Sequence, residues 1–150
     1  MLLVSYLVSP ASGLQDDAAP IAAMASRGPP SPTSRAAWRW ATAIAGANVY
    51  VSFRDLRPRG SITLAWIDSE YLNSASSIHT HMLELMQFDC VTHRLRSLWH
   101  APYSEHAEDA MPKVALDGTA TWQQLAPGSA WGRVAALSCS ELAPPVTANR

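Results

Sequence analysis

The sequence predicts an α+β domain in which a C-terminal helix packs on an antiparallel β-sheet. Three observations favour this fold class. Short apolar segments alternate with turn residues between residues 38 and 100, as they do in antiparallel sheets. One stretch with helical spacing of apolar residues follows Pro127. The chain has 150 residues, of which 48% are hydrophobic, and a chain of this length can bury one sizeable core.

Composition divides the chain into three parts. Residues 1–37 form a signal-like and flexible Pro- and Ala-rich segment that holds five of the eleven prolines. All six tryptophans lie between residues 38 and 131, and large aromatic side chains mark the core because they bury the most area. We therefore expect the domain to span residues 38–142 and residues 143–150 to form a tail.

The predicted strands share short length, apolar content and alternation of side chains between the two faces of a sheet. Predicted turns at residues 46–48 and 57–60 separate the first three strands. Residues 82–86 also have helical propensity, so a helix stays open as an alternative there. The predicted strands are residues 38–40, 49–53, 61–67, 81–88 and 93–100.

The last predicted element is a short helix after Pro127 and Gly128. The Ser129 hydroxyl is placed to accept a hydrogen bond from an unpaired amide at the helix start. We expect the helix to lay one face on the sheet, because buried-type residues recur at helical spacing. These residues are Trp131, Val134, Ala135, Ser138 and Cys139.

Charge and hydropathy exclude two broad classes of function. The formal net charge is −1 and only 15% of residues are charged, so the chain lacks the positive field that holds nucleic acid or an anionic membrane. No apolar run approaches the roughly 20 residues of a membrane-spanning helix. We expect neither a nucleic-acid partner nor a transmembrane segment, and the sequence does not set the oligomeric state.

The N-terminus has some features of an export signal. Its first eight residues are mostly apolar, and the small residues at 22–25 are typical of the region before a signal cleavage site. No basic residue precedes Arg27, so the positively charged start of a signal is missing. We predict export, with residues 1–25 either a cleaved signal or an apolar tail.

The chain has two cysteines, Cys90 and Cys139. Their number allows one disulfide, and it is equally compatible with two free buried thiols. A disulfide would tie the predicted helix to the strand or turn that ends at Asp89. It would close a loop of about 50 residues and, in the chain-entropy model, stabilise the fold by about 4 kcal/mol.

Two groups of titratable residues are candidates for metal binding or catalysis. All five histidines fall within 28 residues, and three of them with Glu84 could bind zinc, although their spacing matches no standard zinc motif. Carboxylates at 105, 108 and 109 could serve acid–base chemistry, but they also fit a solvated loop. We predict no enzyme activity and no cofactor. The histidines are His79, His81, His93, His100 and His106, and the carboxylates are Glu105, Glu108 and Asp109.

Arginines and tryptophans provide the candidate binding residues. Arg94 and Arg96 share one strand face, and their guanidinium groups could grip phosphate or an acidic protein. Further arginines at 54, 57 and 59 could contribute, or could simply solvate a hairpin. Trp38, Trp66, Trp99 and Trp122 exceed what one face of a small sheet can hide, so one or two could be exposed. We predict that Trp99, Arg94 and Arg96 contact a protein partner.

The order of these motifs resembles the bacterial surface-adhesin protein E-like family across about residues 38–140. The shared order starts with an early tryptophan and a Tyr-Val strand at residues 50–51. The most specific parts are the Asp89-Cys90 turn and the tail that runs from Trp122 through Pro127-Gly-Ser129 to Cys139. The other shared segments are the tryptophan strand through Trp66, residues 94–98 and Tyr103-Ser104.

The resemblance implies an extracytoplasmic domain with an antiparallel sheet, a helix packed on it and a disulfide between Cys90 and Cys139. The namesake of the family is a surface lipoprotein that binds host extracellular-matrix and serum proteins, and no enzyme chemistry is associated with the fold. No cysteine precedes Cys90 to carry a lipid, so we expect periplasmic or secreted placement. The predicted function is a non-enzymatic exported binding or envelope-associated module. The alternatives are a zinc-binding envelope protein and a small periplasmic enzyme.

Overall fold

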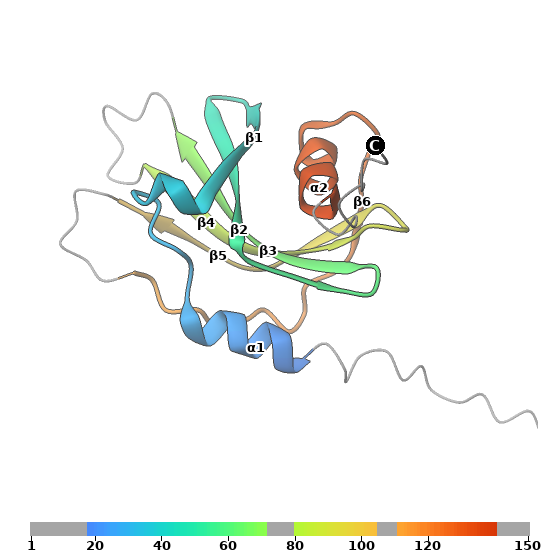
Figure 1. The fold of residues 1–150 in the computed structure, drawn as a ribbon, viewed down its shortest axis with the longest axis horizontal. Coiled ribbons are helices and arrows are strands. Elements are labelled where there is room, and N and C mark those ends of the chain that lie inside the picture. The colour runs from blue at the N-terminus through green and yellow to red at the C-terminus, as the bar shows by residue number, and fades with distance from the viewer. Residues whose placement is uncertain (1–17, 72–79, 105–110, 141–150) are drawn as a thin grey trace, which may run out of the picture.

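A six-stranded antiparallel sheet forms the centre of the fold, and neighbouring strands follow one another in sequence (Figure 1). The computed structural model describes residues 18–71, 80–104 and 111–140, and for residues 53–59 it describes the backbone alone. The antiparallel sheet predicted from the sequence is confirmed. Its strands are β1 (Trp38–Ile44), β2 (Ala47–Arg59), β3 (Ile62–Tyr71), β4 (His81–Asp89), β5 (Arg94–Tyr103) and β6 (Gln123–Gln124).

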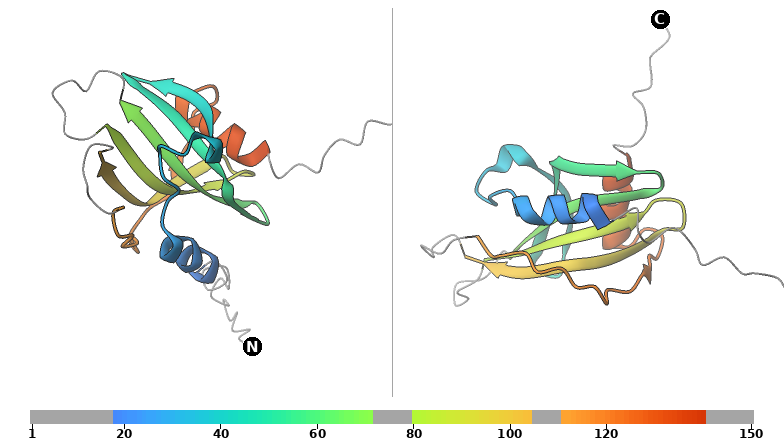
Figure 2. Two further views of the ribbon diagram at one scale, coloured as in Figure 1. Left: turned by 60° about the vertical axis from the view of Figure 1, so that its left-hand side comes forward. Right: turned by 90° about the horizontal axis from the view of Figure 1, so that it is seen from below.

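Helices cover both faces of the sheet. Helix α2 (Ala130–Ser140) packs on one face, as the sequence predicts, and helix α1 (Ala18–Arg27) lies on the opposite face (Figures 1 and 2). We call these the α2 face and the α1 face. A short 3-10 helix, η1 (Arg35–Ala37), leads into β1. None of the helices in the described ranges has the length and apolar character that crossing a bilayer requires.

The hairpin turns lie at other residues than the sequence predicts. The first turn occupies residues 45–46, and Gly46 takes the left-handed φ of 84° that the tight reversal requires. The second turn occupies residues 60–61 and includes only Gly60 of the turn predicted at 57–60, because β2 continues to Arg59 and pairs Pro58 with Thr63. An irregularity between Ser52 and residue 57 accompanies this pairing, and such bulges let a strand accept a proline.

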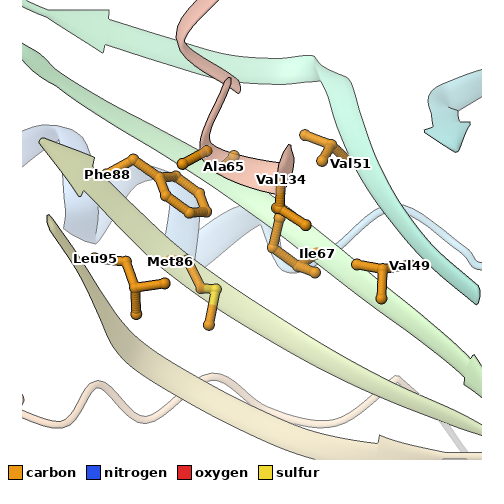
Figure 3. Close-up of a cluster of buried hydrophobic side chains, with 9 residues drawn as sticks. Val49, Val51, Ala65, Ile67, Met86, Phe88, Leu95 and Val134 are labelled. Atoms are coloured by element: carbon orange, nitrogen blue, oxygen red, sulfur yellow. The ribbon is translucent and has the colours of Figure 1, made fainter. Parts of the chain in front are cut away.

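The core on the α2 face joins the last helix to four strands. Val134 and Ala135 of α2 are buried against the sheet, and Figure 3 shows Val134 among the strand side chains. The alternation predicted from the sequence puts these apolar side chains on one face. The strand residues of this core are Val49, Val51, Ala65, Ile67, Met86, Phe88 and Leu95.

The start of α2 is fixed by a side-chain cap and a close backbone approach. The Ser129 hydroxyl accepts a hydrogen bond from the Gly132 amide at 3.0 Å, which confirms the predicted cap. A Cβ at Gly132 would lie only 2.9 Å from the Ala126 carbonyl oxygen, so glycine is required there. Arg133 then donates from Nε to the Thr42 hydroxyl at 2.9 Å and links the helix to β1.

A second core lies on the α1 face and contains the largest side chains. Trp66 and Trp99 meet edge to face, with ring centroids 5.9 Å apart, an arrangement that aromatic pairs favour. Met24 of α1 is fully buried against this core. The other buried members are Ala37, Trp38, Leu64, Leu83, Leu85 and Leu98.

The segment before residue 38 therefore contributes to the folded unit. We expected residues 1–37 to be signal-like and flexible, yet residues from Ala18 onward include α1 and η1. The indole nitrogen of Trp38 donates to the Ser31 carbonyl at 3.0 Å and fixes the connection between them. The apolar start of the predicted signal lies outside the described residues.

Truncation of Met24 tests whether α1 belongs to the folded domain. We expect Met24→Ala to lower the free energy of unfolding by about 2–5 kcal/mol, because it removes a fully buried side chain and leaves a cavity. Urea denaturation followed by tryptophan fluorescence measures the change. Leu116→Ala is the control, since the Leu116 side chain is 40% exposed. Equal stability of the two variants would show that α1 does not support the core.

Candidate functional site

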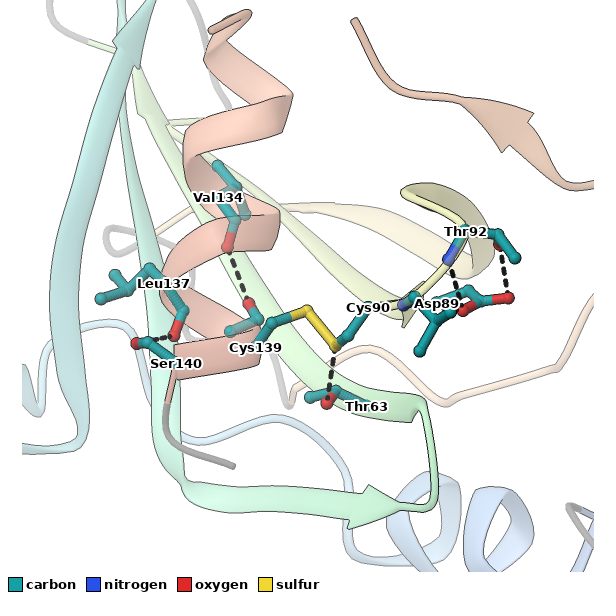
Figure 4. Close-up of a disulfide and its surroundings, with 10 residues drawn as sticks. Thr63, Asp89, Cys90, Thr92, Val134, Leu137, Cys139 and Ser140 are labelled. Atoms are coloured by element: carbon teal, nitrogen blue, oxygen red, sulfur yellow. Dashed lines mark hydrogen bonds between the residues drawn. A yellow bond between two sulfur atoms is a disulfide. The ribbon is translucent and has the colours of Figure 1, made fainter. Parts of the chain in front are cut away.

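The Cys90–Cys139 disulfide joins the end of α2 to the β4–β5 hairpin (Figure 4). The two Cα atoms are 5.7 Å apart, and 49 residues separate the cysteines in sequence. The pairing implied by the family resemblance is therefore confirmed. The bond fixes α2 on the sheet at the end that is farthest from its Ser129 cap.

Asp89 organises the turn that presents Cys90. Its Oδ1 accepts the backbone amides of Val91 and Thr92, both at 3.1 Å, and its Oδ2 accepts the Thr92 hydroxyl at 2.6 Å. The Cys90 amide donates to the Ser61 carbonyl at 2.8 Å. Burial opposes ionisation of Asp89, but these hydrogen bonds and one from Arg94 outweigh it and lower the pKa. The Asp89-Cys90 motif is therefore a structural device that holds the disulfide.

The predicted binding residues Arg94 and Arg96 gather around Trp122. Their guanidinium carbons lie 5.4 and 4.7 Å from the centroid of the Trp122 ring. Arg94 also pairs with Asp89 at 3.2 Å, and Arg96 donates from Nε to Gln87 at 2.6 Å. Stacking on an indole and hydrogen bonding hold both guanidinium groups in place. We call Arg94, Arg96 and Trp122 the arginine–tryptophan cluster.

Trp99 does not belong to this cluster. We predict from the sequence that Trp99 lies on an exposed patch with Arg94 and Arg96, but its side chain is buried and packs against Trp66. A register shift in the pairing of β4 and β5 follows Leu85, so the alternation of side chains is interrupted between Ser97 and Trp99. Trp99 therefore points into the core of the α1 face. The half-buried Trp122, which directly precedes β6, provides the aromatic ring that Arg94 and Arg96 contact.

A buried polar network lies on the α1 face near β1. Asp68 is fully buried, and its Oδ1 lies 2.9 Å from His81 Nδ1. Arg35 of η1 reaches Asp68 at 3.3 Å and Glu70 at 2.7 Å. Burial, and then the hydrogen bond that its hydroxyl donates to Glu70 at 3.1 Å, raise the pKa of Tyr50. Because Asp68 and His81 are closed to solvent, this network holds η1 on β3 and is not open to a substrate.

The histidines that the structure describes do not converge. His81 is buried on the α1 face, His100 is exposed on the α2 face, and His93 occupies the hairpin turn with a φ of 52°. Among the described residues, no group of three or more His, Cys, Asp or Glu side chains is placed to hold a metal ion. Other sequence candidates lie outside the described residues or have side chains that are not described: His79, His106, Glu105, Glu108, Asp109, Arg54, Arg57 and Arg59.

Glu84 lines a cavity on the α2 face, between the sheet and the start of α2. The cavity has a volume of about 360 Å³. Within the described part of the chain, the half-buried Glu84 carboxylate makes no hydrogen bond or ion pair. Burial raises its pKa from 4.5 to about 7. The other lining residues include Met86, Leu95, Ser97, Gln123 and Trp131.

The sequence predicts Glu84 only as a candidate zinc ligand and does not predict this cavity. The sequence does contain one indication of an unusual environment for Glu84. Residues 82–86 are apolar except for Glu84, so its carboxylate is flanked by residues that are typical of a core. No family model and no curated protein matches this chain.

Loss of the disulfide tests its contribution to stability. We expect Cys90→Ala with Cys139→Ala to lower the free energy of unfolding by about 4 kcal/mol, because the bond restricts a loop of roughly 50 residues in the unfolded chain. Urea denaturation with and without reductant measures this. Reductant should lower the free energy of unfolding of the natural protein by a similar amount, and it should leave that of the double variant unchanged. A natural protein that is insensitive to reductant under denaturing conditions would contradict the prediction.

The raised pKa of Glu84 predicts a dependence of stability on pH. Between about pH 4.5 and 7 the folded state binds more protons at Glu84 than the unfolded state does, so stability falls as the pH rises. Above about pH 7 the charged carboxylate costs about 3 kcal/mol at most. We expect Glu84→Gln to stabilise the protein at about pH 8 and much less at about pH 5.

Thermal unfolding at the two pH values measures this effect. Glu70→Gln is the matched control, because it makes the same chemical change on the α1 face but removes an ion pair with Arg35. We expect the control to destabilise the protein at the higher pH. A gain from Glu84→Gln that is equal at both pH values would refute the pKa assignment.

Proposed function

We propose that this domain is a non-enzymatic binding module that acts outside the reducing cytosol. Its arginine–tryptophan cluster contacts an acidic surface on a protein partner. The observation that carries the proposal is the stacking of Arg94 and Arg96 around a single half-buried indole. The resemblance to the surface-adhesin protein E-like family supports the same class of function.

The chemistry of the cluster suits protein recognition. Arginine and tryptophan are the residue types that most often dominate binding energy at protein interfaces. Guanidinium groups that are already held by stacking and hydrogen bonds lose little freedom when they meet a carboxylate, and they can bind it through two parallel bonds. The net charge of −1 argues that any attraction is local to the cluster.

The disulfide supports placement outside the cytosol. Thiols are kept reduced in most cytosolic proteins, whereas disulfides persist in the periplasm and outside the cell. Asp89 links the two features, because it both fixes the turn at Cys90 and pairs with Arg94. The covalent bond and the proposed binding residues therefore depend on one hairpin.

Binding assays on immobilised extracellular-matrix and serum proteins test this function. We expect at least one protein of the panel to bind, with an affinity that falls as salt is raised. Arg94→Ala with Arg96→Ala should weaken that binding by about tenfold or more, since both stacked guanidinium groups are lost. Surface plasmon resonance measures the affinities.

The control keeps the change in charge but moves it away from the cluster. Arg27→Ala with Lys113→Ala removes two exposed basic groups elsewhere on the chain, and it should bind as the natural protein does. Equal affinities for the two double variants would contradict the role of the cluster. Free thiols at Cys90 and Cys139 in protein taken directly from cells would contradict the placement outside the cytosol.

A further inference from the structure

We propose that the cavity beside Glu84 is a binding site for a small organic cation, an ammonium ion with a short apolar body. The site lies on the α2 face, whereas the arginine–tryptophan cluster lies on the α1 face. The two proposals therefore concern separate surfaces, and neither rests on the other.

The cavity is built by elements that are firmly held. Strands β4 and β5 form its floor, and residues from β6 and the start of α2 form its walls. The Ser129 cap and the Arg133–Thr42 bond position α2, and the Leu125 amide donates to the His93 carbonyl at 2.9 Å. A volume of about 360 Å³ is at the small end of ligand cavities. The cavity therefore suits a ligand smaller than a typical drug.

The lining of the cavity favours a cation with an apolar body. Among the described lining residues Glu84 is the only charged one, and within the same part of the chain its carboxylate has no partner. An unpaired, partly buried carboxylate is costly, and a bound ammonium group would remove that cost. Met86, Leu95 and Trp131 supply apolar and aromatic surface, and an indole attracts cations through its ring face.

A metal ion fits this lining less well. Among the described residues, no three metal-ligating side chains come together at Glu84 or elsewhere. One carboxylate and the neutral Ser97 and Gln123 do not provide the ligand set that tight binding of a divalent cation requires. An anion is disfavoured because it would face the Glu84 carboxylate.

In the described part of the chain, few charged groups lie near Glu84. On β5, His100 is paired with Glu84, and on β3 the paired residue is the neutral Ile67. On α2, Arg133 is directed to the Thr42 hydroxyl and the Gly128 carbonyl. The neighbouring β6 residues Gln123 and Gln124 are neutral. His100 is therefore the group whose protonation must be separated from that of Glu84.

Proton linkage gives this site a distinctive signature. Glu84 has a pKa of about 7, and a bound cation favours its ionised form. Binding should therefore release protons below neutral pH. The affinity for a permanently charged ligand should rise more than tenfold between about pH 5.5 and pH 8. His100→Gln removes the neighbouring imidazole and should retain this dependence.

Titration with choline, butylammonium and phenylethylammonium tests the proposal. The indole N–H signal of Trp131 in ¹⁵N-edited NMR spectra reports occupancy, and Trp131→Phe assigns the signal. We expect saturable binding of at least one of these cations to the full chain. The uncharged alcohol that has carbon in place of the choline nitrogen should bind at least tenfold more weakly.

Paired variants decide the role of Glu84. Glu84→Gln should weaken cation binding by tenfold or more and abolish proton release, while Glu70→Gln should bind as the natural protein does. Calorimetry in two buffers of different ionisation enthalpy measures the protons. No saturable binding of any of the three cations would overturn the proposal. Equal binding by Glu84→Gln, or equal binding of the uncharged alcohol, would also overturn it.

Discussion

The disulfide between α2 and the β4–β5 hairpin is the constraint on which both proposed sites depend. An antiparallel sheet with two apolar faces must be covered on both sides. Helix α2 covers one of them, but a helix of eleven residues is barely stable by its own propensity and depends on tertiary contacts. The Ser129 cap holds one end of α2 and Cys139 holds the other. The start of α2 lines the cavity beside Glu84 with Ser129 and Trp131, so the position of this short helix helps to shape the cavity.

The same hairpin serves the other face of the sheet. Asp89 closes the turn at Cys90 and also accepts a bond from Arg94, so the residue that holds the disulfide also positions the arginine–tryptophan cluster. On that face Trp66 and Trp99 pack edge to face in the core, and the ring of Trp122 stacks with Arg94 and Arg96. Structural and proposed binding roles are thus distributed among different tryptophans.

Two polar groups on opposite faces show how environment sets the role of a carboxylate. Asp68 is fully buried but has His81 and Arg35 as partners, as a buried charge requires. Glu84 is half-buried without such partners in the described chain, and burial alone raises its pKa to about 7. We therefore read Asp68 as part of the scaffold and Glu84 as a group that is open to a ligand.

Local sequence determined the fold class, the cap at Ser129 and the stripe of buried residues on α2, because caps and helical periodicity are set by neighbours in the chain. The family resemblance implied that Cys90 and Cys139 form a disulfide, whereas the cysteine count alone is equally compatible with two free thiols. Only the tertiary structure decided that Trp99 is buried, because a register shift after Leu85 depends on the pairing of two strands. The packing of Met24 and the cavity at Glu84 likewise needed the structure, since both depend on contacts between elements that are distant in sequence.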